Sequence, residues 1–174
     1  MPIARGSIQH RIHEDIISFL SSNIFTDMCK QVDAESKEII EKEISSYFDN
    51  FKITLFPYAR TSLYAVLKSL NLKKGSKILC TPVNIYPMVN IIENLGYKVD
   101  FTDLNLIEFG PDYKYLEEKL SQKPSCFFLT YLFGYVPNMS LIIELCDKYN
   151  VPLIEDISQN IGSKYNSKLL GTFG

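Results

Sequence analysis

The chain has 174 residues, of which 46 % are apolar, and a formal net charge of −2. This length fits one domain, or one domain with an appendage. The lack of a basic surplus argues against binding to nucleic acid or to a membrane through a polybasic patch. No apolar run approaches the ~18–20 residues of a membrane-spanning helix, and Met1–Ser7 contains no apolar signal-peptide core. We therefore expect a soluble, cytoplasmic protein whose four cysteines, at positions 29, 80, 126 and 146, are reduced.

Residues 1–56 are predicted to form a helical segment. One helix is expected over about 9–20 and a second over about 34–48, with Asp33 as a plausible N-cap of the second. The second helix would present one apolar face, formed by Ile40, Ile44, Tyr47 and Phe48.

His10 and His13 could share a face of the first helix. No pattern of Asp, Glu or Cys around them resembles a metal site, so we interpret both as solvent-exposed and expect no metal.

Residues 57–174 alternate between helical and strand patterns. The strands are continuous apolar runs, which is typical of a mostly parallel sheet covered by helices on both faces. The sequence therefore predicts an α/β fold, a three-layer sandwich. The expected helices are 61–71, 86–95, 112–120 and 139–149, and the expected strands are 77–81, 97–102, 126–130 and 151–155.

Asp156 directly follows the last of these strands. Its carboxylate is therefore expected at the carboxyl end of a parallel strand, where open α/β sheets bind ligands. Gln159 lies three residues further on, within reach of the same place. A carboxylate here could hold a protonated pyridinium N–H, or it could only cap the segment that follows, and its position alone leaves both readings open.

The segment Ala59–Leu63 opens the 61–71 helix. Helix N-termini bind anions through free backbone N–H groups and the helix dipole. Thr61 and Ser62 would add hydroxyl donors and Arg60 a positive charge, which together suit a phosphate. Ordinary N-capping by Thr61 or Ser62 explains the same residues, and for this segment alone it is the simpler reading.

Two further positions follow predicted strands. Tyr86 comes shortly after the 77–81 strand, where a ring could stack on a flat cofactor or belong to the core. Phe133-Gly134 follows the 126–130 strand, where a glycine permits a sharp turn. The sequence contains no GxSxG, Walker A or GxGxxG pattern, so neither a nucleophile elbow nor a dinucleotide-binding turn is indicated.

Taken in order, these pieces resemble the DegT/StrS-type sugar aminotransferases of the aspartate aminotransferase (fold type I) superfamily. The resemblance covers about two thirds of the chain, and its block around Asp156 is the most specific. The matching blocks are Arg60–Leu63, Pro82 with an aromatic residue soon after, Asn90–Asp103, Tyr131–Met139, Val151–Tyr165 and Gly171–Gly174.

The resemblance implies the first part of a fold type I large domain that binds pyridoxal 5'-phosphate (PLP). Asp156 would bind the ring nitrogen and Gln159 the phenolic oxygen. Thr61 and Ser62 would hold the phosphate, and Tyr86 would stack on the ring. The family transfers an amino group, commonly from glutamate, to a keto group on a nucleotide-linked sugar, and it works as a dimer.

The chain departs from the family pattern in several places. It ends at Gly174, before the serine and the Schiff-base lysine that follow this block in the family, and Lys164 and Lys168 stand at the wrong place to replace that lysine. Ala59 stands where the family often has glycine.

The segment 82–96 is one residue shorter than usual, so that Asn84 could align with the stacking position instead of Tyr86. The first 56 residues also do not show the family's usual N-terminal substrate loop.

We therefore expect a fragment or half-enzyme, completed by a further segment or by a complementing chain, with no catalytic residue in this stretch. Three alternatives stay open: a non-catalytic relative with a binding or regulatory role, a PLP-dependent sugar dehydratase in which histidine replaces the lysine, and an unrelated flavodoxin-like domain. A further segment that carries the lysine would favour the aminotransferase over the non-catalytic relative and the dehydratase.

Overall fold

The computed structural model describes residues 34–174. The helix expected over 9–20, the histidines at 10 and 13, Cys29 and the N-cap Asp33 lie outside the described residues. Within residues 34–174, no helix has the length and apolar character needed to cross a bilayer.

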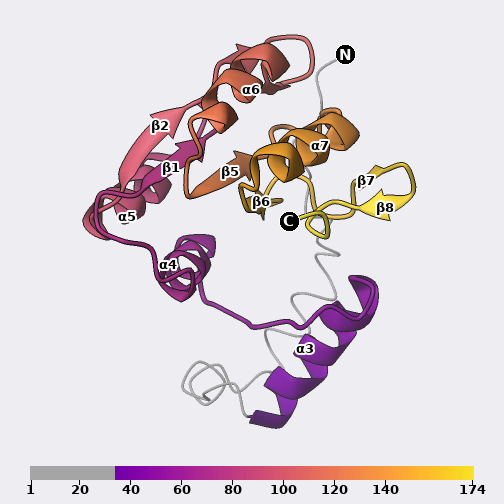
Figure 1. The fold of residues 1–174 in the computed structure, drawn as a ribbon. Coiled ribbons are helices and arrows are strands. Elements are labelled where there is room, and N and C mark those ends of the chain that lie inside the picture. The colour runs from indigo at the N-terminus through magenta and orange to yellow at the C-terminus, as the bar shows by residue number, and fades with distance from the viewer. Residues whose placement is uncertain (1–33) are drawn as a thin grey trace.

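A four-stranded parallel sheet forms the centre of the fold (Figure 1). The strand order is β2-β1-β5-β6, and all three neighbouring pairs are parallel. The predicted parallel sheet is therefore confirmed. Its strands are β1 (Lys77–Cys80), β2 (Lys98–Phe101), β5 (Cys126–Thr130) and β6 (Leu153–Asp156).

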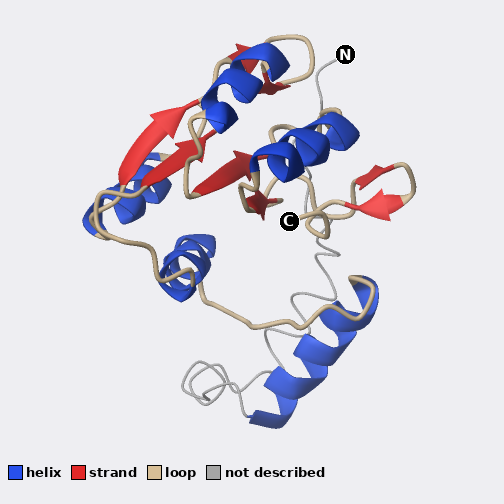
Figure 2. Cartoon of the chain, viewed as in Figure 1, coloured by secondary structure: helices blue, strands red, loops and turns tan. Residues whose placement is uncertain are grey.

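Helices cover both faces of this sheet (Figure 2). They are α4 (Ala59–Ser69), α5 (Tyr86–Asn94), α6 (Tyr113–Ser121) and α7 (Met139–Tyr149). Buried residues of α4 and α5 share one core cluster, and those of α6 and α7 share the other. The three-layer sandwich expected from the sequence is thus confirmed.

Successive residues of β5 show how one strand serves both layers. Phe127 belongs to the cluster under α6 and α7, whereas Phe128 belongs to the cluster under α4 and α5. Both rings are almost fully buried because side chains alternate across a sheet that is covered on both faces.

Two of the helix boundaries follow sequence signals directly. Asp112 caps α6, because its Oδ1 accepts the N–H of Tyr115 at 2.9 Å. Gly96 follows α5 with a φ of +82°, the left-handed conformation that ends many helices.

The helix predicted over 34–48 is confirmed as α3 (Ala34–Tyr47). Its apolar face is only partly covered: the side chains of Ile40 and Tyr47 are exposed, while Ile44 and Phe48 are half-buried. Ile44, Tyr47 and Phe48 line an apolar cavity of about 430 Å³ together with Ile157 and Ile161. The division of the chain at residue 56 stays a prediction.

Two short antiparallel pairs complete the fold. The β7–β8 pair (Lys164–Tyr165 and Lys168–Leu169) is the hairpin expected after Asp156. The β3–β4 pair (Leu104–Asn105 and Gly110–Pro111) was not predicted, because its strands have two residues each and no apolar alternation.

Candidate functional site

The candidate site lies at the carboxyl ends of β1 and β5, where the connections diverge. The chain leaves β1 through α5 toward β2, and it leaves β5 through α7 toward β6 on the opposite face. Such a switch point leaves a crevice outside the strand ends, which is where open α/β sheets bind ligands. Asn84 spans this crevice, because its Nδ2 donates to Thr130 Oγ1 at 2.8 Å.

A cavity of about 290 Å³ occupies the crevice. It is bounded by the start of α4, the β1–α5 loop and the segments that follow β5 and β6. Asp156, Gln159, Arg60, Asn84, Ile85 and Phe133 are among its lining residues. A second cavity, of about 270 Å³, adjoins it beneath α4 and shares Asp156 and Ser158 with it.

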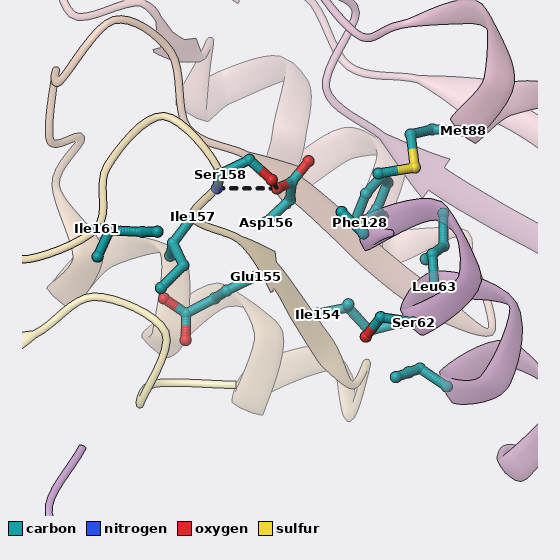
Figure 3. Close-up of a pocket in the computed structure, with 12 residues that line it drawn as sticks. Ser62, Leu63, Met88, Phe128, Ile154, Glu155, Asp156, Ile157, Ser158 and Ile161 are labelled. Carbon is teal, nitrogen blue, oxygen red and sulfur yellow. Dashed lines mark hydrogen bonds between the residues drawn. The ribbon is translucent and has the colours of Figure 1, made fainter. Parts of the chain in front are cut away.

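Asp156 is the last residue of β6 and pairs in register with Thr130 of β5. Its Oδ1 accepts a hydrogen bond from the backbone N–H of Ser158 at 3.0 Å, shown in Figure 3, and another from the Ser158 hydroxyl. Among the described residues no partner hydrogen-bonds to Oδ2. The carboxylate is thus held by one oxygen and retains an acceptor on the other.

Gln159 lines the same cavity with its amide orientation fixed. Its Oε1 accepts the backbone N–H of Phe133 at 3.0 Å. Because an amide carries its acceptor and its donors on opposite sides, this bond commits the oxygen and leaves the Nε2 group as a donor. No hydrogen bond from Nε2 is found within residues 34–174.

Helix α4 begins at Ala59, two residues earlier than the sequence indicated. Tyr58 is its N-cap residue, and the Tyr58 carbonyl accepts the N–H groups of Thr61 and Ser62 at 2.9 and 3.1 Å. The uncommitted backbone donors of the described first turn are therefore those of Ala59 and Arg60, at the cavity. Ser62 lines the adjoining cavity, and Thr61 lines neither.

Tyr86 lies apart from the other predicted site residues. It is the first residue of α5, its side chain is 74 % exposed, and it lines neither cavity. The positions just before it, Asn84 and Ile85, line the crevice cavity instead. Asn84 was the alternative position considered from the sequence, whereas Ile85 carried no polar or aromatic signal that could have singled it out.

The sequence indicated a sharp turn after β5 at Phe133-Gly134, and the structure shows this turn held by two residues that sequence reasoning missed, Asn160 and Phe109. Phe133 and Gly134 both have positive φ, +55° and +81°. Asn160, whose side chain is buried, accepts the N–H of Gly134 at 3.2 Å and donates to the carbonyl of Tyr135 at 2.9 Å. Phe109 packs edge-on against Phe133, with ring centroids 5.8 Å apart. A buried asparagine is found only through its partners, so no sequence signal marked Asn160.

The lysines of the β7–β8 hairpin do not reach the site. Lys164 and Lys168 are exposed and line neither cavity. The Nζ of Lys168 lies over the ring of Phe173, 4.3 Å from its centroid. Both positions agree with their interpretation as solvated charges.

Comparison with known proteins shows that the model of the DegT/DnrJ/EryC1/StrS aminotransferase family matches residues 7–174. A GDP-perosamine synthase of Escherichia coli O157:H7 is 28 % identical over 113 residues, which are 65 % of this chain and 31 % of that protein. A pleiotropic regulatory protein of Geobacillus stearothermophilus is 25 % identical over 113 residues, 65 % of this chain and 30 % of that protein.

Among solved structures, the E. coli GDP-4-keto-6-deoxy-D-mannose-3-dehydratase with bound hydrated PLP superposes with a TM-score of 0.78 at 19 % identity. The superposition covers 97 % of this chain and 43 % of the dehydratase. This likeness shows that the fold is that of the fold type I PLP enzymes. The chain spans less than half the length of each of these three proteins.

Proposed function

The chain belongs to the DegT/DnrJ/EryC1/StrS aminotransferase family, and on that premise we propose that it is the PLP-binding part of an enzyme that transfers an amino group to a keto group of a nucleotide-linked sugar. The amino donor in this proposal is glutamate, and the working assembly is a dimer in the cytoplasm.

The observation that carries the proposal is the pairing of Asp156 and Gln159 in one cavity. Each residue has one polar atom committed within the protein and another uncommitted among the described residues: Oδ2 of Asp156 is an acceptor and Nε2 of Gln159 is a donor. PLP offers the complementary groups, a protonated ring nitrogen and a phenolic oxygen. The residues present therefore fit the cofactor.

The start of α4 suits the phosphate of the same cofactor. The N–H groups of Ala59 and Arg60, the positive end of the helix dipole and the Arg60 side chain all favour an anion at this place. Thr61 and Ser62 keep their proposed role as hydroxyl donors, although the helix begins before them. Tyr86 or its neighbours Asn84 and Ile85 would pack against the ring.

When bound, PLP acts as an electron sink for the substrate carbon that carries the amino group, provided that its ring nitrogen stays protonated. The task of Asp156 is to keep that proton in place, because a carboxylate that accepts the N–H stabilises the charged ring. The hydrogen bonds from Ser158 fix the orientation of the Asp156 carboxylate. Gln159 orients the ring by donating to its phenolic oxygen.

No lysine lines either cavity within the described residues. In this proposal the Schiff-base lysine comes from a segment beyond Gly174 or from a complementing chain. A PLP-dependent sugar dehydratase is the second candidate, because a GDP-4-keto-6-deoxy-D-mannose 3-dehydratase is 26 % identical over 107 residues. A lysine in that segment would support the aminotransferase, and a histidine would support the dehydratase.

The test is a titration of the purified chain with PLP, followed by absorbance and fluorescence. We expect saturable binding that Asp156→Ala weakens by roughly 10- to 100-fold, because a charge-assisted hydrogen bond is lost. Asp147→Ala, which removes an exposed carboxylate at the end of α7, is the matched control and should bind like the parent. Equal affinity of Asp156→Ala and the parent would show that Asp156 does not hold the ring nitrogen.

A further inference from the structure

We propose that Glu155 is a positioning residue for the cofactor site, which ties the end of β6 to the segment Gly171–Gly174 and thereby fixes Asp156. This inference rests on the proposed function, since it concerns the same cavity. It adds a residue that is absent from the lining of the crevice cavity, that borders the adjoining cavity beneath α4, and whose carboxylate contacts Tyr131 of the core under α6 and α7.

The Glu155 carboxylate collects four hydrogen bonds. Its Oε2 accepts the hydroxyl of Tyr131 at 2.6 Å and the N–H of Gly171 at 2.9 Å. Its Oε1 accepts the N–H groups of Phe173 and Gly174, both at 2.7 Å. Three backbone donors of one short segment therefore converge on a single side chain of β6.

Glu155 and Asp156 are neighbours whose side chains lie on opposite faces of the sheet, as strand alternation requires. Figure 3 shows the two carboxylates pointing in different directions from β6. Asp156 lines the crevice cavity, whereas Glu155 contacts Tyr131, which belongs to the core cluster under α6 and α7. A movement of β6 that releases Glu155 would therefore also move Asp156.

The segment Gly171–Gly174 also approaches Leu153 of β6 and Ile157 just after it, on either side of Glu155. A side chain at Gly171, whose φ is +85°, would place Cβ 2.9 Å from Cδ1 of Ile157. A side chain at Gly174 would place Cβ 2.6 Å from the carbonyl oxygen of Leu153. Both glycines thus permit a close approach. The segment holds positions 153, 155 and 157, the alternate residues that bracket Asp156.

Tyr131 serves this arrangement as a donor. Its side chain is buried, and that burial, together with the nearby Glu155 carboxylate, raises the pKa of the phenol well above its ordinary value. The hydroxyl therefore stays protonated and donates to Glu155 across the physiological pH range.

Only a carboxylate satisfies this set of donors. A glutamine at position 155 would offer one oxygen to four donors, and its amide N–H₂ would face backbone N–H groups. The Tyr131 side chain is buried and the Phe173 N–H is partly buried, so leaving either donor without an acceptor is costly. The N–H groups of Gly171 and Gly174 are exposed and would turn to water. The segment and the end of β6 would therefore separate in part. Asp156 would then lose the fixed position that a cofactor-binding group needs.

Glu155→Gln tests the inference through PLP affinity, measured where circular dichroism shows the variant to be folded. We expect the Kd for PLP to rise about tenfold. Amide hydrogen exchange at Gly171, Phe173 and Gly174 should accelerate in the same variant. Tyr131→Phe removes one donor and keeps the carboxylate, so its Kd should rise less than that of Glu155→Gln.

The control is Leu120→Ala, a buried position at the end of α6 that lines neither cavity. It should lower stability and leave the Kd for PLP unchanged in the folded protein. If Glu155→Gln keeps the parent's Kd while exchange at Gly171–Gly174 accelerates, Glu155 has a structural role only and the inference is wrong.

If Glu155→Gln does not fold, Tyr131→Phe decides by the same criterion. The inference is supported if Tyr131→Phe has a higher Kd for PLP than the parent while Leu120→Ala keeps the parent's Kd. It is overturned if Tyr131→Phe also keeps the parent's Kd. Failure of the parent itself to bind PLP would overturn the proposed function and this inference together, and it is therefore distinguishable from failure of the inference alone.

Discussion

Gln159 accepts the backbone N–H of Phe133 at 3.0 Å, which ties the turn after β6 to the turn after β5. The bond joins two segments 26 residues apart in the sequence. It gives one side chain two tasks, because the oxygen holds the turn while the nitrogen of the same amide is available to a ligand.

The two tasks can be separated by substitution. Gln159→Glu keeps an oxygen for Phe133 but has no donor, and it adds a negative charge near Asp156; Gln159→Leu removes both functions. We expect both variants to bind PLP roughly tenfold or more weakly, whereas only Gln159→Leu should speed amide exchange at Phe133. Parent-like PLP affinity in Gln159→Glu would rule out the donor role.

Asn160 should matter for stability. Its buried side chain satisfies the N–H of Gly134 and the carbonyl of Tyr135. Asn160→Ala leaves two backbone groups without partners, and we expect a loss of about 2–3 kcal/mol in the free energy of unfolding, measured in urea. The exposed Asn94→Ala should change it by less than about 0.5 kcal/mol. Equal effects of the two variants would contradict the assigned role.

The different positions of Ile85 and Tyr86 predict which of the two side chains contacts the cofactor ring. Ile85 lines the crevice cavity and Tyr86 does not. If this arrangement holds with PLP bound, Ile85→Ala should weaken binding several-fold, by roughly 1 kcal/mol for lost apolar contact, and Tyr86→Ala should have little effect. The reverse order, in the same PLP titration, would restore Tyr86 as the stacking residue.

Asp100 on β2 should give a measurable pH dependence. Burial raises its pKa, but the hydrogen bond and charge of Lys119, 2.8 Å away, and the charge of Lys77 outweigh burial, so the pKa lies below its ordinary value. A lowered folded-state pKa stabilises the protein above the unfolded pKa of about 3.9, and this is lost as the pH falls through the folded pKa.

Asp100→Asn should therefore be less stable than the parent by about 0.5–1 kcal/mol near neutral pH. The difference should shrink as the pH falls below the unfolded pKa of about 3.9 and through the lowered folded-state pKa, where the carboxyl of the parent becomes protonated. Urea unfolding at several pH values provides the measurement. A difference that persists unchanged in acid would mean that the lost contact is not electrostatic.

The buried thiols should be unreactive in the native chain. Burial raises the pKa of Cys80, Cys126 and Cys146 to about 12, with the nearby Cys126 contributing at Cys80 and Asp147 at Cys146. In a Cys29→Ser background we expect alkylation at about pH 8 to be at least ~100-fold slower without urea than with it. A thiol that reacts equally fast in both would reveal local opening of its strand or helix.

The core of the fold was predictable because its signals are local. The apolar run Cys126–Thr130 is a strand over the same residues, and Asp112 caps the helix that it was expected to open. The start of α4 was placed two residues late, because Tyr58 caps through its backbone and has no side-chain cap for a sequence pattern to detect. The β3–β4 pair depends on Asn105, whose side chain accepts the N–H groups of Ile107 and Glu108.

The candidate site was predictable only in part. Asp156 and Gln159 were chosen for their position after a strand, and the structure brings them into one cavity. Thr61 and Tyr86 lie outside the cavity linings, so their roles stay predictions. Glu155 and Asn160 could not be identified, because their partners lie 16–24 and 25–26 residues away in the sequence, and all of them except the Tyr131 hydroxyl are backbone groups.

The adjacent carboxylates of β6 also protect the strand against misalignment. A slip of one residue against β5, whose register pairs Thr130 with Asp156, would exchange the two acids. Glu155 would then enter the crevice with a longer side chain, and Asp156 would be too short to reach the N–H groups at the far face. A chain misaligned in this way would thus lose the contacts of Glu155 and the ligand-binding acid at the same time.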